Sequence, residues 1–106
     1  MSSTLEETSA PTSAVTRCSQ AMENAYRAAL STRERDEPEF MRANRAEKTA
    51  AKAYREAMPP LSGSENIRSF IACVAQGLLL KVFNSSESTQ LFYAAQVANS
   101  AASKRP

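Results

Sequence analysis

Apolar residues are densest between Ile67 and Phe83, and their spacing predicts a helix that belongs to the core. At about 100° per residue, one face of this segment carries Ile67, Phe70, Ile71, Val74 and Leu78, which is typical of a helix packed against neighbours. Residues 78–83 are apolar nearly all the way round. Such a surface must be enclosed by the rest of the domain or covered by another chain, and the sequence leaves both alternatives open.

Similar patterns predict three more helices, over residues 13–33, 37–58 and 85–102. The first two carry a row of small residues at alternating spacings of three and four, which favours a close approach of two helices. These rows are Ala14, Cys18, Ala21, Ala25 and Ala28 in the first helix, and Ala43, Ala46, Ala50, Ala53 and Ala57 in the second. Because alanine is also the best helix former, the rows have a second explanation in helix propensity alone.

Prolines separate the predicted helices. Pro38 would remove a hydrogen bond from a continuous helix, and Pro59-Pro60 makes the firmest break in the chain. We therefore predict an all-α, four-helix bundle-like domain over residues 13–102, built from two helical hairpins, with the third helix spanning residues 64–83. Residues 1–12, rich in Ser, Thr and Glu, are expected to form a flexible tail, and residues 103–106 to fray.

Three predicted helix starts carry capping signals. Asp36 precedes Glu39 by three residues, and Ser62 precedes Glu65 by the same interval, with Ser64 as a second candidate cap. Asn84 precedes Glu87 in the same way. Each pair predicts a reciprocal capping box at the start of the helix that follows it.

Composition agrees with a helical protein and adds information on charge. The chain has 2 Gly and no Trp, and no segment alternates apolar and polar residues as a strand does. A formal charge of +2 is too small to indicate nucleic-acid binding by itself. Most Lys and Arg residues lie in the first half of the chain, so the basic character belongs to the first two helices.

The second predicted helix carries a basic ridge, defined here as Arg45, Lys48, Lys52 and Arg55. These residues fall within about 80° of one another, roughly opposite the alanine row. No Glu precedes them by four residues, so we expect little local pairing. The ridge could contact phosphates or an acidic protein surface, or it could simply be a solvated face.

Candidate chemistry is sparse. The chain has no His, which removes the usual general base and the commonest metal ligand. Cys18 and Cys73 belong to no CxxC pair and are expected to be buried, inert thiols. The acidic cluster of Asp36, Glu37 and Glu39 lies where capping explains it better than catalysis. We therefore predict no catalytic, cofactor-binding or metal site, and a protein that is not an enzyme.

The sequence favours a cytoplasmic location. Arg68, Gln76 and Lys81 interrupt an apolar run that is shorter than the ~20 residues of a membrane span. The first residues include Glu6 and Glu7 and lack the apolar region of a signal peptide, although a Ser/Thr-rich start also occurs in proteins exported without a cleaved signal.

Several motifs in the second half of the chain resemble a known group of sequences. They are Met58-Pro59-Pro60-Leu61-Ser62-Gly63, Glu65-Asn66-Ile67-Arg68, Phe70-Ile71-Ala72-Cys73-Val74-Ala75 and Leu91-Phe92-Tyr93-Ala94-Ala95-Gln96-Val97-Ala98. These motifs are similar to the C-terminal half of a set of short, uncharacterised bacterial proteins. The resemblance implies a bacterial, cytoplasmic protein and supplies no function.

Together these observations predict a small helical interaction or regulatory protein. Its partner would be another protein or a second copy of the chain, with no small-molecule ligand. The predicted contacts are the basic ridge and an apolar edge formed by Leu79, Leu80 and Phe83. The alternative is a nucleic-acid-binding accessory protein that contacts phosphates through Arg45, Lys48, Lys52 and Arg55.

Overall fold

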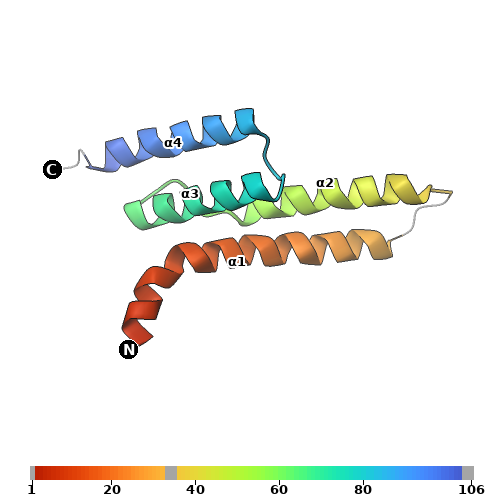
Figure 1. Cartoon of the computed structure of the whole chain (residues 1–106), viewed down its shortest axis with the longest axis horizontal. Coiled ribbons are helices and arrows are strands. Elements are labelled where there is room, and N and C mark those ends of the chain that lie inside the picture. Colours follow the sequence, from red (N-terminus) through yellow and green to blue (C-terminus); the bar gives the residue numbers. More distant parts are fainter. Residues whose placement is uncertain (1, 33–35, 104–106) are drawn as a thin grey trace. The chain divides into compact units, whose positions relative to one another are not determined.

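The part of the chain that the structure describes forms four α-helices, as predicted (Figure 1). A computed structural model describes residues 2–32 and 36–103, with side chains over 10–32 and 36–101. The helices are α1 (Ser2–Ser31), α2 (Glu39–Ala57), α3 (Ser64–Leu79) and α4 (Ser85–Ser103), and these described residues contain no strand. The predicted all-α class is therefore confirmed. The chain divides into two compact units, Arg17–Ala57 and a second made of Met1–Thr16 with Met58–Pro106.

The structure differs from the prediction at both ends of α1. The helix begins at Ser2, ahead of the predicted start at residue 13, and Pro11 lies inside it. Although Pro11 has no amide hydrogen to donate to the preceding turn, the helical backbone continues on both sides of it. α1 ends at Ser31, and its predicted last residue, 33, lies outside the described residues. The same is true of residues 104–106, whose fraying was predicted.

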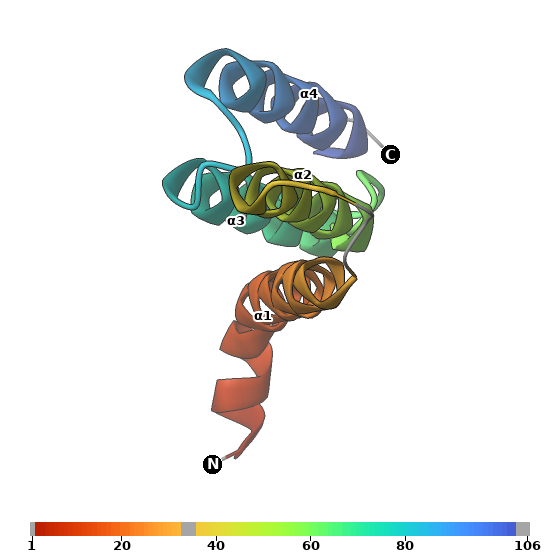
Figure 2. The ribbon, with the colours of Figure 1, turned by 90° about the vertical axis from the view of Figure 1, so that its right-hand side faces the viewer.

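The unit Arg17–Ala57 is a helical hairpin, in which α2 runs antiparallel beside α1 (Figures 1 and 2). The buried residues of α2 are Ala46, Ala50 and Tyr54, so the middle of the predicted alanine row faces inward, whereas Ala43, Ala53 and Ala57 are only partly buried. In α1 the buried positions shift from Cys18 to Ala29, whereas Ala28 is exposed. A helix with 3.6 residues per turn drifts away from a strict 3.5-residue repeat, which explains why Ala29 replaces Ala28 at the far end.

α2 starts without the predicted capping box. The backbone carbonyl of Pro38 accepts the amides of Met41 (3.1 Å) and Arg42 (3.0 Å), so the helix begins at Glu39. Asp36 lies in the preceding turn with a φ of 61°. Asp is one of the few side chains that tolerate this left-handed conformation, and it serves the turn instead of capping the helix.

α3 and α4 form the second hairpin, and they lie side by side and antiparallel in both views (Figures 1 and 2). The buried residues of α3 are Ile67, Ser69, Phe70, Cys73, Val74 and Gly77, and they form its inward stripe. Ile71 and Leu78, predicted to belong to this stripe, lie at its margin and are partly exposed. On α4 the most buried residues are Ser88 and Ala95.

α3 ends at Leu79, earlier than the predicted residue 83. Lys81 adopts a left-handed conformation with a φ of 65°, its amide donates to the Leu78 carbonyl, and the amide of Val82 donates to the Gly77 carbonyl (2.8 Å). These two bonds are those of a Schellman C-cap, which satisfies carbonyls at the helix end. Because the chain turns here, Val82 and Phe83 are buried outside the helix.

The two helix starts in this hairpin differ. The predicted serine cap of α3 is wrong, because Gly63 is the N-cap, with a φ of 83° and no side-chain hydrogen bond. At α4 the predicted capping box is confirmed. The amide of Asn84 donates to Glu87 Oε1 (2.9 Å), and the amide of Glu87 donates to Asn84 Oδ1 (2.7 Å).

Candidate interaction surfaces

Arg45 is a structural clamp and not a free member of the basic ridge. Its Nε and Nη2 donate to the two carboxylate oxygens of Glu37, at 3.0 and 2.9 Å. Nη2 also donates to the carbonyl of Thr32 (2.8 Å), just after the end of α1. With 31% of the Arg45 side chain and 10% of the Glu37 side chain exposed, this is a partly buried, two-pronged ion pair.

The expectation that Arg45 lacks a carboxylate partner is therefore wrong. The prediction was based on residues four positions away on the same helix, whereas Glu37 lies eight residues before Arg45, in the loop before α2. A planar guanidinium can bind a carboxylate with one edge and reach a helix-terminal carbonyl as well. Arg45 thus joins the loop and the end of α1 to α2.

A second arginine acts at the opposite end of the same hairpin. Arg17 Nε, on α1, donates to the carbonyl of Ala57 at the end of α2 (3.4 Å). Positive charge is favourable beside the carbonyls at a helix C-terminus. Each helix of the α1–α2 hairpin therefore contributes an arginine to the C-terminal end of the other.

The remaining ridge residues stay at the surface. Lys48, Lys52 and Arg55 are all exposed. Lys52 Nζ lies 4.0 Å from Glu56 Oε2, and both side chains are largely open to solvent, so this pair is weak. Lys48 forms no ion pair with any residue in the part of the chain that the structure describes. The ridge is thus reduced to three exposed cations.

The predicted apolar edge is also revised. Leu79 is 75% exposed and Leu80 is 39% exposed, whereas Phe83 is only 4% exposed and faces the interior. Phe83 is buried because the helix ends at Leu79 and the chain turns at Lys81. Leu78 is 37% exposed, so the solvent-facing group is Leu78, Leu79 and Leu80, which we term the leucine edge.

Two further pairs of exposed apolar side chains were not predicted as sites. Phe40 and Met41 are exposed in the first turn of α2, and Tyr93 and Val97 are exposed on α4. In the sequence Tyr93 and Val97 are four residues apart, which places them on one side of α4, opposite the buried Ala95. This spacing is the signal by which the sequence could have indicated the pair. Large apolar residues gathered on one helix face are typical of contact surfaces.

The described residues offer little to bind a metal ion. Among them, no three His, Cys, Asp or Glu side chains are grouped as a metal site requires. Cys18 and Cys73 form no disulfide, and both are buried, as predicted. Neither thiol is positioned to react with a solvent-borne substrate.

Comparison with protein-family models, with curated proteins and with solved structures found no match to this chain. Within the described ranges, no helix combines the length and apolar character needed to cross a membrane. What these surfaces bind is therefore inferred from the exposure and charge of their own residues.

Proposed function

We propose that this chain is a non-enzymatic, cytoplasmic interaction protein that binds other protein chains through exposed apolar side chains of the α3–α4 hairpin. The observation that carries the proposal is the leucine edge, where Leu79 is largely exposed and the adjoining Leu78 and Leu80 are partly exposed. Covering apolar area is worth about 25 cal/mol per Å², so an exposed run of this kind favours association. The absence of His from the sequence supports a role in binding over a role in acid–base catalysis.

Site-specific photocrosslinking tests this proposal. A benzophenone amino acid in place of Leu79 should give a covalent product with another polypeptide in the expressing cell. The matched control places the same group at Glu47, which is exposed on α2 and lies outside both surfaces. Equal yields at the two positions, or no product at Leu79, would contradict the proposal.

The second candidate is binding to nucleic-acid phosphates through Lys48, Lys52 and Arg55, which remain exposed. With Arg45 engaged by Glu37, fewer cations are available than the sequence suggested. If the ridge binds a duplex, affinity should fall with salt, and Lys52→Ala should reduce the slope of log K against log salt concentration by about one. Absence of duplex binding at low salt would exclude this candidate.

A further inference from the structure

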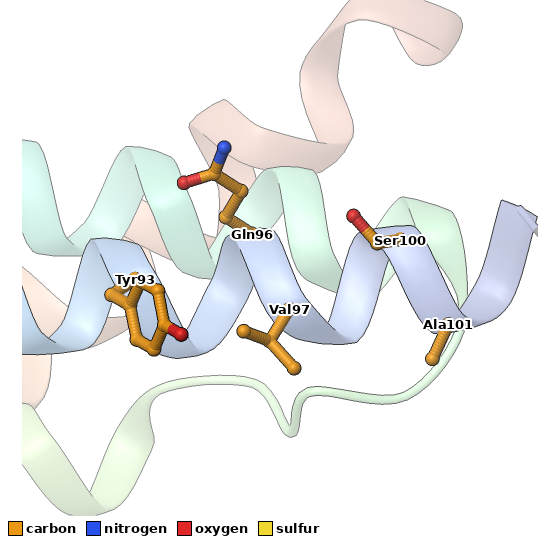
Figure 3. Close-up of a pocket in the computed structure, with 5 residues that line it drawn as sticks. All are labelled: Tyr93, Gln96, Val97, Ser100 and Ala101. Carbon is orange, nitrogen blue, oxygen red and sulfur yellow. The ribbon is translucent and has the colours of Figure 1, made fainter.

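The outer face of α4 has a shape that suits a particular partner. Tyr93 is 68% exposed and Val97 is 50% exposed, and both lie about 160° round the helix from the buried Ala95. After Val97, the side chains on this part of α4 are small, as at Ser100 and Ala101. Together these residues border a hollow of about 460 Å³, whose described lining is Tyr93, Gln96, Val97, Ser100 and Ala101 (Figure 3).

The same face carries no formal charge. Between Glu87 and Lys104 the sequence contains no Asp, Glu, Lys or Arg. A charged partner would gain no opposite charge there, whereas two copies of this face can meet without repulsion between like charges. Electrostatics therefore favours an uncharged partner surface, and α4 itself is one.

We propose that the outer face of α4 binds the same face of a second copy of this chain, with the two helices antiparallel about a two-fold axis at Val97. Tyr93 lies four residues before this axis and Ala101 four residues after it. At 1.5 Å per residue, each lies about 6 Å from the axis along the helix. Tyr93 then meets the small side chain of Ala101 of the partner subunit, and the reverse contact follows by symmetry.

This arrangement satisfies the requirements of a two-fold interface with one helix. A large, exposed side chain, Tyr93, and a small one, Ala101, lie on the same face at equal distances from Val97, so the surface complements itself. The antiparallel orientation also places opposite ends of the two helix dipoles together. A contact made by one helix face is small, so we expect a dissociation constant on the order of 1–100 µM.

The inference rests on the proposed function in that both require the α3–α4 hairpin to bind protein, but it concerns a different surface. Sedimentation equilibrium from about 5 to 500 µM brackets the expected affinity and should show a monomer–dimer equilibrium. Val97→Glu sets two like charges together at the axis and should weaken the dimer by about 10-fold or more. The matched control, Leu79→Glu, adds the same charge to a more exposed leucine on α3 and should leave the dimer unchanged.

Disulfide trapping gives an independent measure of the pairing. Under mild oxidation Val97→Cys should form a covalent dimer, because this residue meets itself across the axis. Leu79→Cys should form it about 10-fold more slowly, and the native cysteines do not compete because both are buried. Circular dichroism should confirm that each variant remains helical.

The outcomes separate the two proposals. A wild-type chain that stays monomeric up to about 500 µM, or a Val97→Cys chain that is trapped no faster than Leu79→Cys, would overturn the α4 dimer. Neither result alters a crosslink from position 79, which tests the proposed function by itself. Loss of the dimer in Leu79→Glu alone would instead place self-association at the leucine edge.

Discussion

The two hairpins of this protein use different chemistry for the same architecture. In the α1–α2 hairpin, arginine side chains bind carbonyls at both helix C-terminal ends, and Arg45 holds the connecting loop through Glu37. In the α3–α4 hairpin, the turn is closed by the Schellman bonds around Lys81 and by the Asn84–Glu87 capping box. The first therefore depends on long charged side chains, and the second on the backbone and a short cap.

The difference extends to what each hairpin leaves at its surface. The α1–α2 hairpin carries most of the charged residues of the chain. Charged side chains are favourable at a solvent-exposed surface, so much of the outer surface of this hairpin is favourably exposed to water. The second has few charges and exposes the leucine edge together with Tyr93 and Val97. The hairpin with fewer charges therefore exposes more apolar surface. We place the contacts with other chains on this α3–α4 hairpin.

The largest effect should come from the core of the α1–α2 hairpin. Tyr54 is completely buried and is the one large residue among the buried positions of α2, so Tyr54→Ala removes an aromatic ring from the core and leaves a cavity. We expect a loss of about 3–5 kcal/mol in the free energy of unfolding, measured by urea denaturation at low protein concentration. Tyr93→Ala is the matched control, since Tyr93 is largely exposed, and it should change stability by less than about 0.5 kcal/mol.

The arginine clamp should give the next largest effect. Arg45→Ala removes both hydrogen bonds to the mostly buried Glu37 carboxylate and the donor to the Thr32 carbonyl, so we expect a loss of about 2–3 kcal/mol. Lys48→Ala, one turn further along α2, should cost less than about 0.5 kcal/mol. Similar losses for the two variants would show that the hairpin does not depend on the clamp.

The capping box tests the other hairpin. Asn84→Ala removes the acceptor for the amide of Glu87 and should lower the free energy of unfolding by about 1 kcal/mol. Asn84→Ser keeps a side-chain oxygen at this position and should retain most of the stability. Equal losses in the two variants would mean that the cap contributes little.

The smallest predicted change is a gain. Lys81 holds a left-handed conformation that glycine adopts without steric cost, so Lys81→Gly should raise the free energy of unfolding by about 0.5–1 kcal/mol. Lys81→Ala removes the same charge but keeps the Cβ atom, and it should give no such gain. A stabilised Lys81→Ala variant would assign the effect to charge and not to the backbone.

Local patterns made part of this structure predictable from the sequence. The four helices follow from apolar spacing and proline breaks, and the Asn84–Glu87 box follows from two residues three positions apart. The contact between Arg45 and Glu37 was not predictable in this way, because Glu37 lies in the loop before α2, where helical spacing does not apply.

The apolar edge shows the same limit more sharply. Leu79 and Phe83 belong to one apolar segment in which Lys81 is the only charged residue, and no local pattern tells which of them faces solvent. The answer depends on where α3 stops, which is set by the hydrogen bonds of Leu80, Lys81 and Val82 with the preceding turn. Ending the helix at Leu79 buries Phe83 and leaves Leu79 outside.

Each hairpin contains one buried thiol, whose chemical labelling can measure how often that hairpin opens. Cys18 lies on α1 within the unit Arg17–Ala57 and Cys73 lies on α3, and both side chains are inaccessible in the folded protein. A thiol-specific reagent can modify either one only after its surroundings open. The rate of labelling at each position, followed by mass spectrometry on the unaltered chain, would therefore reveal whether the two hairpins open together or one at a time.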